Sequence, residues 1–334
     1  MERSIYHSKN FNGKIFLNSE ITTVIKPGEF LTILPKFFKK VPERKPKIIP
    51  GPFSIDMEKL NKSEKGQLYI VWLGHSSVLI QIDGLNILTD PAFGKYASPV
   101  QGFGPKRFFQ SPLTLKEMPN IDYVLYSHNH YDHLDKKTTR ILATKNVKFI
   151  CPLGVGQNLL KWGIDRSTIL ELDWWEDHKL NENVKLVATS ARHFSGRGTR
   201  DRNKSLWCSF VIQGKTNKVF FGADSGFMSV FEEIGNTFGP FDISMLEIGA
   251  SSPYWPDIHM GPEKAIKAHK ILNADLFLPI HWGTYNLAPH PWKEPVRKVM
   301  EFAKENQVKL FLPIPGTIYK IDGKEVISKW WENY

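Results

Sequence analysis

The segment 127–133, SHNHYDH, holds the residue types most suited to chemistry, with three histidines and an aspartate within six residues. Neutral imidazole nitrogens and carboxylate oxygens are the ligands that zinc takes in catalytic sites, where one coordination position stays open. His128 and His130 are two residues apart, so an extended segment directs both rings to one side. Four ligands this close can serve two ions, with His128 and His130 on one and Asp132 and His133 on the other.

Two ions need further ligands, and three candidates each follow a predicted strand. They are His193, His281 and Asp224, the last of which lies among small residues that let a carboxylate approach and bridge two ions. A lone histidine after a strand is more often structural than metal-bound. The order of these residues after the histidine cluster, at strand ends where α/β folds gather their sites, favours ligation.

Strand patterns dominate the chain from about residue 67. Asp83-Gly84 predicts a tight hairpin turn between two apolar, β-branched runs. Helices are predicted at 135–145 and 262–272, the second with a proline at a tolerated early position. Strands are predicted at 68–73, 77–82, 85–90, 121–126, 184–189, 207–213, 218–221, 243–248 and 276–280. This alternation predicts a layered α/β architecture, and no linker divides residues 60–334.

Composition narrows the class of protein. The chain has 334 residues, 41% of them hydrophobic, and no apolar run near the roughly 18 residues of a spanning helix. No secretory signal is recognisable, and two cysteines are too few for a disulfide framework, which predicts a cytoplasmic protein. The net charge of +10 suits a polyanion such as nucleic acid, an anionic membrane or a phosphorylated substrate, or serves solubility alone.

Residues 1–60 differ from the rest and predict an N-terminal arm ahead of one larger domain, residues 61–334. Residues 28–40 mix bulky apolar side chains with lysines. Such a mixture is typical of a peripheral element at the inner membrane face, with apolar residues in the lipid boundary and lysines at anionic headgroups. The alternative is an arm that packs on its own domain.

The succession of HxHxDH, a strand-end histidine, an aspartate after Gly-Ala and a late histidine resembles the metallo-β-lactamase superfamily. That resemblance implies an αββα sandwich with a dizinc site at its edge. The chain is more similar still to N-acylphosphatidylethanolamine-hydrolysing phospholipases D and their bacterial relatives. The segments that carry this resemblance span about residues 65–290 and include WLGH (72–75), LTDP (88–91), GPKRF (104–108), SHNHYDHLD (127–135), ELDWWE (171–176), FEEIG (231–235), FGPFD (238–242) and IHWGT (280–284).

The resemblance also implies a role for each matching residue. One zinc ion takes His128, His130 and His193. The other takes Asp132, His133 and His281, and Asp224 bridges the two. His259 and Tyr131 match residues that contact the substrate phosphate, and dimerisation is a further implication.

A mechanism follows as a hypothesis. A hydroxide shared by two zinc ions attacks the phosphorus of a phosphodiester, and Asp132, His259 and Tyr131 are the catalytic candidates. His259 is suited to protonating the leaving alkoxide. With N-acylphosphatidylethanolamine the products are N-acylethanolamine and phosphatidate. Lys106 and Arg107 are candidate phosphate contacts, although solvated surface charge is the commoner fate of such a pair.

Several residues carry weaker hypotheses. Asp90 is a candidate to orient a ligand imidazole, with a plain turn as the alternative. His75 is more plausible as a structural histidine than as part of the site. Four tryptophans could line an acyl pocket, although residues of this size usually lie in the core: Trp174, Trp175, Trp255 and Trp282.

Three rival functions stay open. The first is a dizinc hydrolase of small soluble esters or lactones, against which the GPKR and ELDWWE motifs favour the phospholipase branch. The second is a metal-dependent nuclease, but no basic run interleaved with aromatics is present and no nucleic-acid partner is expected. The third is a metal-binding scaffold, which would require a missing ligand, whereas every ligand position is filled.

Overall fold

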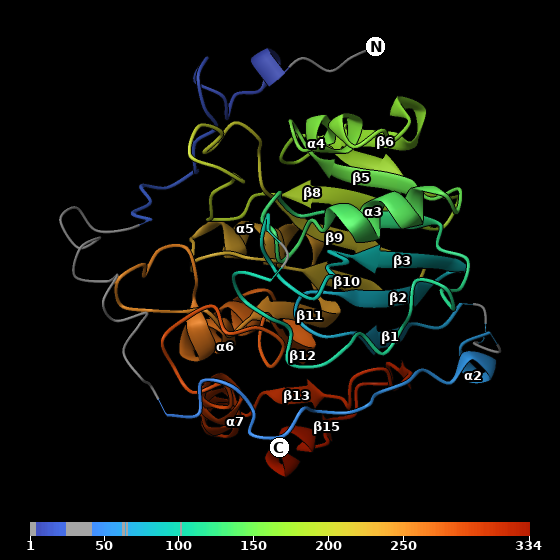
Figure 1. The fold of residues 1–334 in the computed structure, drawn as a ribbon, viewed down its shortest axis with the longest axis vertical. Coiled ribbons are helices and arrows are strands. Elements are labelled where there is room, and N and C mark those ends of the chain that lie inside the picture. The colour runs from blue at the N-terminus through green and yellow to red at the C-terminus, as the bar shows by residue number, and fades with distance from the viewer. Residues whose placement is uncertain (1–4, 25–41, 62–63, 65, 101) are drawn as a thin grey trace.

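The computed structural model describes residues 5–24, 42–61, 64, 66–100 and 102–334. Two mixed sheets face each other (Figure 1). The first has seven strands in the order β14-β1-β2-β3-β4-β5-β6, and the second has eight in the order β15-β13-β12-β11-β10-β9-β8-β7.

The strands of the first sheet are β1 (Tyr69–Trp72), β2 (Val78–Ile82), β3 (Leu85–Thr89), β4 (Tyr123–Leu125), β5 (Lys148–Pro152), β6 (Ile169–Leu172) and β14 (Tyr319–Lys320). Those of the second are β7 (Asp177–Lys179), β8 (Lys185–Thr189), β9 (Ser209–Gln213), β10 (Lys218–Phe221), β11 (Phe241–Glu247), β12 (Ala274–Ile280), β13 (Lys309–Leu312) and β15 (Val326–Ile327). The helices are α2 (Met57–Asn61), α3 (Lys136–Ala143), α4 (Gly156–Lys161), α5 (Val230–Phe238), α6 (Gly261–Ile271) and α7 (Glu294–Asn306), with short 3-10 turns at Ile5–His7, Arg166–Thr168 and Trp330–Asn333.

The two faces of the first sheet bury different cores. Along β1, Ile70 and Trp72 join the core between the sheets, whereas Val71 packs into the core beneath the outer helices. Because side chains alternate along a strand, a strand covered on both faces reads as a continuous apolar run. The predicted hairpin follows β2, where Asp83 and Gly84 both adopt positive φ, as a tight primed turn requires.

Helices cover the outer faces of both sheets. Leu142 of α3 and Leu159 of α4 pack into the outer core of the first sheet. Ile266 of α6 and Val299 of α7 are buried with the strands of the second sheet. Asp135 caps α3 by accepting a hydrogen bond from the backbone N–H of Thr138 at 2.6 Å. The predicted αββα sandwich is therefore confirmed.

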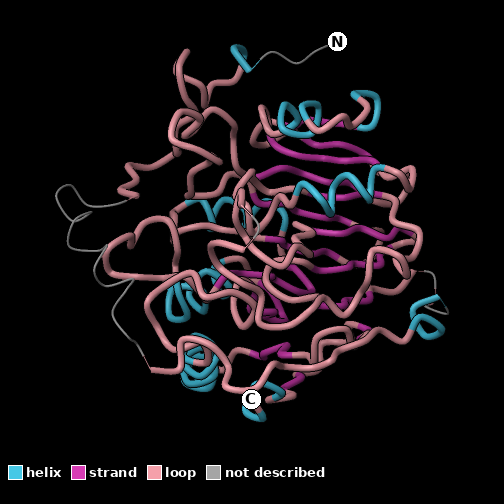
Figure 2. Tube along the Cα trace, viewed as in Figure 1, coloured by secondary structure: helices cyan, strands magenta, loops and turns pink. Residues whose placement is uncertain are grey.

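The strand ends meet along one edge of the sandwich. Strands occupy one side of the tube trace and long loops gather at the other (Figure 2). The loops after β1, β3, β4, β8, β10 and β12 carry, in that order, His75, Asp90, the 127–133 segment, His193, Asp224 and His281. Strand direction and pairing thus bring together residues separated by up to two hundred positions in the chain.

The N-terminal arm packs on the hydrolase domain where it is described. Phe16 is fully buried, and the backbone N–H of Thr23 donates to the Asp257 carboxylate at 3.0 Å. The predicted membrane element at residues 28–40 lies outside the described residues. Among the described parts of the chain, no helix combines the length and the apolar character needed to cross a bilayer.

One buried histidine in the fold predicts a pH dependence of stability. His269 on α6 contacts the Ser244 hydroxyl of β11 at 2.8 Å, and burial lowers its pKa to about 4. The unfolded chain therefore binds a proton near pH 6.5 that the folded chain does not, and stability falls as the pH drops from about 6.5 to 4. We expect the free energy of unfolding to fall by about 2 kcal/mol, through His269 alone, when the pH is lowered from 7 to 5.

Denaturant unfolding of the parent and of His269→Gln at both pH values measures this effect. The variant should lose about 2 kcal/mol less than the parent over the same interval, because glutamine does not titrate. Equal losses in the two proteins would contradict the prediction. Since His269 lies on the helix behind the sheet, metal content should be the same in both and is checked alongside.

Candidate metal centre

Three histidines from two loops converge on one point. The Nε2 atom of His128 lies 2.8 Å from Nδ1 of His130, and Nε2 of His193 lies 3.3 Å from the same atom. His128 and His193 are buried, and all three nitrogens lie within 4.8 Å of one another. This is the histidine trio that the sequence places on one ion.

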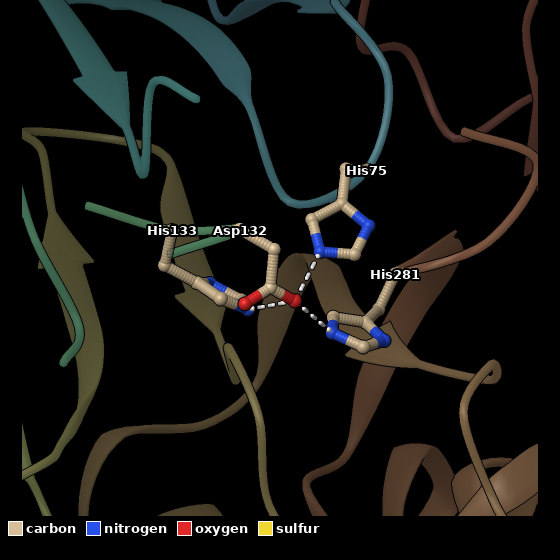
Figure 3. Close-up of side chains that lie close together, drawn as sticks. All are labelled: His75, Asp132, His133 and His281. Atoms are coloured by element: carbon tan, nitrogen blue, oxygen red, sulfur yellow. Dashed lines mark hydrogen bonds and ion pairs between the residues drawn. The ribbon is translucent and has the colours of Figure 1, made fainter. Parts of the chain in front are cut away.

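A second group lies beside it and is centred on Asp132 (Figure 3). The Asp132 Oδ2 atom lies 3.3 Å from Nε2 of His281 and 3.5 Å from Nε2 of His133. A third ring also points at this oxygen, with Nε2 of His75 at 3.0 Å. The three residues predicted for the other ion are therefore together, joined by one further histidine.

Asp224 lies between the two groups. One carboxylate oxygen is 3.2 Å from Nε2 of His133, and the other is 3.1 Å from Nε2 of His281. The second oxygen also faces the histidine trio, at 3.7 Å from His193 and 4.0 Å from His128. Its contacts with both groups are those required of a bridging ligand.

The donor atoms fit divalent metal ions. Nε2 of His133, Nε2 of His281 and Oδ1 of Asp224 are buried, and none of them makes a hydrogen bond of good geometry among the described residues. Polar atoms are rarely buried without such a partner, so a set of them facing one point fits a bound cation. Imidazole and carboxylate donors suit zinc among the common metals.

The electrostatics of the two groups differ. Burial lowers the pKa of His130 to about 4, and that of His128 and His193 well below the usual value. Burial acts in the same direction on His281, but the Asp224, Asp132 and Glu247 carboxylates together outweigh it and raise the pKa of His281 to about 10. The trio is thus neutral and ready to bind a cation, whereas His281 must release a proton when a metal ion binds.

Hydrogen bonds behind the ligands set which ring nitrogen faces the centre. Nδ1 of His133 contacts the Asp90 carboxylate at 2.8 Å, and Nδ1 of His128 contacts the Ser127 hydroxyl at 2.9 Å. Ser127 in turn donates to Asp90 at 2.6 Å. Asp90 therefore lies where the predicted orienting role requires it, and this one buried carboxylate holds two candidate ligand rings, one directly and one through Ser127, with Nδ1 turned away from the centre.

His193 is held from two sides. Its Nδ1–H donates to the backbone carbonyl of Ile258 at 3.0 Å. The Asn18 side chain accepts from the His193 backbone N–H at 3.0 Å and donates to its carbonyl oxygen at 2.8 Å. The N-terminal arm therefore helps to position a predicted metal ligand.

Glu247 is a functional candidate that sequence reasoning missed. It ends β11, is fully buried and forms a short hydrogen bond to Nδ1 of His259. Its other oxygen accepts from the backbone N–H groups of Ser225 and Met260 at 3.1 and 3.2 Å. Burial raises the pKa of Glu247. An acid inside the apolar run ISMLEIG (243–249) was the available signal, because carboxylates are rarely buried without a role.

His75 is the second residue that the sequence analysis undervalued. Its ring is buried, stands 4.1 Å from the His281 ring between centroids, and points its Nε2 at Asp132. Burial lowers the pKa of His75 to about 3. It follows the end of β1, the same position after a strand that the predicted ligands occupy, and this was the signal that could have found it.

A cavity of about 270 Å³ opens onto the centre. His259 is on its wall and also lines a neighbouring cavity of about 630 Å³. The apolar part of the wall consists of Val24, Phe194, Ala250, Trp255, Ile258 and Leu287. Of the four candidate tryptophans only Trp255 lines this cavity, since Trp174 and Trp282 are in the core and Trp175 is exposed.

Three predicted substrate contacts lie elsewhere. The Arg107 guanidinium is buried and donates to the backbone carbonyls of Leu73, Ala92 and Phe109, so it is not free for a phosphate. Lys106 is exposed on the preceding loop. The Tyr131 hydroxyl donates to the Arg197 carbonyl at 2.9 Å, and its side chain lines a different cavity. These placements correct the sequence-based expectation of direct phosphate contacts.

Arg197 joins the two loops that carry the histidine trio. Its guanidinium donates to the carbonyls of Asn129 and Leu134, both at 2.8 Å, and lies 3.8 Å from the centre of the Tyr131 ring. Asn129 accepts in return from the backbone N–H of Gly196 at 2.8 Å. This cross-link holds the 127–133 segment against the loop that follows His193.

Arg197→Ala should therefore weaken metal binding without removing a ligand. We expect a 10- to 100-fold faster loss of metal to a chromophoric chelator, about the effect of removing a residue that orients metal ligands. Arg197→Lys should fall between the parent and the alanine variant, because lysine lacks the planar fork. Arg200→Ala is the matched control, because Arg200 is exposed and lies only three residues after Arg197. If Arg197→Ala retained metal as well as the parent does, the proposed role of Arg197 in holding the two loops together would be wrong.

The comparisons with known proteins agree with this geometry. The model of the β-lactamase superfamily domain matches residues 85–282. An uncharacterized protein of Mycobacterium tuberculosis is similar at 39% identity over 285 residues, covering 84% of this chain and 76% of that protein. The N-acyl-phosphatidylethanolamine-hydrolyzing phospholipase D 1 of Caenorhabditis elegans is 36% identical over 67% of this chain, which spans 65% of that enzyme's length.

Solved structures agree on the fold. The metallo hydrolase Igni18 of Ignicoccus hospitalis superposes with a TM-score of 0.59 at 20% identity, covering 77% of this chain and 99% of that one. At this identity the likeness concerns the fold alone. Together with the family match and the convergent donor atoms, it identifies the chain as a metal-dependent hydrolase of the β-lactamase superfamily.

Proposed function

We propose that the protein is a dizinc phosphodiesterase of phospholipase D type that hydrolyses N-acylphosphatidylethanolamine. The observation that carries the proposal is the position of Asp224 between two ligand groups, with His259 on the wall of the same cavity. Two metal ions side by side suit the displacement of one oxygen by another at phosphorus. The proposed substrate is that of the relative in Caenorhabditis elegans, which is named for the hydrolysis of that lipid.

The ligand residues define what the centre would supply. His128, His130 and His193 would hold one ion, Asp132, His133 and His281 the other, and Asp224 both. When bound, two zinc ions would supply the Lewis acidity that lowers the pKa of a water towards 7 and offsets negative charge on the phosphoryl oxygens. His75 would steady Asp132 through its Nε2 atom.

His259 is the residue placed to protonate the leaving group. The new bond forms between a water oxygen and phosphorus, and the bond between phosphorus and the ethanolamine oxygen breaks. His259 donates its proton to that departing oxygen, releasing N-acylethanolamine and leaving phosphatidate. Glu247 holds the ring by its Nδ1, so that Nε2 is the atom available for transfer.

The cavity wall is consistent with a lipid substrate. Phe194, Trp255, Ile258 and Leu287 border the centre with apolar surface, and the neighbouring cavity of about 630 Å³ lies beyond His259. Apolar walls with a few convergent polar groups are typical of ligand pockets. A phosphoryl group at the metal centre would thus have apolar surface beside it for the chains of a lipid.

Hydrolysis in ¹⁸O-labelled water tests the proposal. The zinc-loaded protein is incubated with N-acylphosphatidylethanolamine in mixed micelles, with the metal-stripped protein as control. We expect N-acylethanolamine without label and phosphatidate carrying one labelled oxygen, measured by mass spectrometry, because the P–O bond is the one that breaks. Cleavage of a soluble phosphodiester without cleavage of the lipid would overturn the substrate. Cleavage of a lactone or β-lactam alone would overturn the phosphodiesterase.

A further inference from the structure

The largest of the cavities described here, about 810 Å³, lies outside the metal pocket and has a basic wall. Lys136, Lys137 and Arg140 of α3 line it, and all three are exposed. None of them has an ion pair with any described residue. The one acid on the wall, Asp135, is engaged in capping α3 through its hydrogen bond from Thr138. With three exposed cations against one acid, the wall carries net positive charge.

Exposed apolar side chains stand next to this charge. Pro99 lines the same cavity, and its neighbour Val100 is 55% exposed. Phe103, on the same loop, is 74% exposed. The loop is closed at its base by an antiparallel bridge between Tyr96 and Lys106. The ring of Phe103 therefore adds nothing to the core and, with Val100, gives the loop an exposed apolar surface beside the basic wall.

The basic cavity and the metal pocket are lined by side chains of the same segment, residues 130–132. His130 and Asp132 line the metal pocket, whereas Tyr131 between them lines the basic cavity. Consecutive side chains of the same loop thus face the two cavities. Helix α3, which begins soon after the ligand segment, lies over the outer face of the first sheet (Figure 1).

We propose that α3 and the loop residues Pro99, Val100 and Phe103 dock the protein on the anionic face of a phospholipid bilayer. Unpaired lysine and arginine side chains attract anionic headgroups, and an adjacent aromatic and aliphatic pair enters the headgroup boundary. Charge alone would suit nucleic acid equally, but the exposed valine and phenylalanine favour lipid. The inference rests on the proposed function in one respect: a lipid substrate has to be reached in a bilayer, and this surface adjoins the centre that would cleave it.

Vesicle sedimentation tests the docking surface without any catalytic step. The zinc-loaded full chain is mixed with phosphatidylcholine vesicles containing 0 to 40% phosphatidylglycerol and none of the proposed substrate. The test variant is Lys136→Glu/Lys137→Glu/Arg140→Glu. The matched control is Lys215→Glu/Lys270→Glu/Lys304→Glu, with the same change of net charge at exposed sites that precede β10, β12 and β13, at the edge opposite the metal centre.

The parent should bind anionic vesicles and not neutral ones, and added salt should release it. The α3 triple variant should bind roughly 100-fold more weakly, since each basic residue near the surface contributes about fivefold. Phe103→Ser should bind about tenfold more weakly, because its ring no longer enters the boundary. The control triple should stay within about threefold of the parent, and every variant should retain cleavage of a soluble phosphodiester, which reports folding.

If both triple variants lost binding equally, the proposal would be overturned, because net charge alone would then explain the attraction to the vesicles. So would the absence of binding to anionic vesicles by the parent. Binding of single-stranded DNA that depends on α3, without vesicle binding, would overturn it in favour of nucleic acid. Vesicle binding that persists in a protein unable to cleave N-acylphosphatidylethanolamine would support the docking surface while the proposed substrate fails, so the two hypotheses are tested apart.

Discussion

Replacing Asp224 with alanine should lower kcat/KM for phosphodiester hydrolysis by about 1000-fold or more and remove metal from both halves of the centre. Among the described residues Asp224 is the carboxylate that faces both ligand groups, at 3.1 Å from His281 and 3.7 Å from His193. Loss of one preorganised electrostatic contact at a reaction centre costs about 100- to 1000-fold. Here the same side chain also holds the ions, so the effect should lie at or beyond the upper end.

Metal analysis separates this loss from misfolding. We expect the parent to hold two ions per chain and Asp224→Ala to hold one or fewer, with the circular dichroism spectrum of the parent. Asp275→Ala removes an exposed carboxylate at the start of β12 and is the matched control. Its metal content and kcat/KM should equal those of the parent. Two ions and activity within tenfold of the parent in Asp224→Ala would show that this carboxylate bridges nothing.

Replacing His259 with alanine should lower kcat by about 100- to 10,000-fold while both ions remain bound. The proposed role is proton donation to the departing ethanolamine oxygen, and a positioned acid contributes about this much. Glu247→Gln should cost about 10- to 100-fold, because glutamine keeps the shape of the partner of His259 but not its charge. His178→Ala, on the exposed strand β7, is the matched control.

The choice of leaving group makes this prediction specific. A p-nitrophenolate departs without a proton, whereas an alkoxide requires one. The ratio of parent to His259→Ala rates should therefore be near one for a p-nitrophenyl phosphodiester and large for the alkyl ester. An equal loss on both substrates would assign His259 to binding or to the structure of the site, and would contradict the proton-donor role.

The helices and strands show how far local patterns reach. Apolar, β-branched runs and the Asp83-Gly84 turn predicted the first hairpin within a residue or two, because turn chemistry and alternation are local properties. The same reading left β5, β6, α4, α5, α7 and β13 without a prediction. These elements depend on pairing and packing with other segments, as β5 does between β4 and β6, and a local pattern does not show those contacts.

The candidate site likewise combines features that the sequence predicted with features that only the structure showed. The sequence by itself predicted the candidate metal ligands as a set, since His128, His130, Asp132 and His133 lie within six residues and motif order supplied the other three. Only the tertiary structure decided that Glu247 holds His259 and that His75 reaches Asp132. It also decided that the Arg107 guanidinium is used by three backbone carbonyls rather than by a phosphate. The physical reason is that ligand identity is a property of residue type and spacing, whereas distance and hydrogen-bond partners depend on how two sheets bring separate strand ends to one edge.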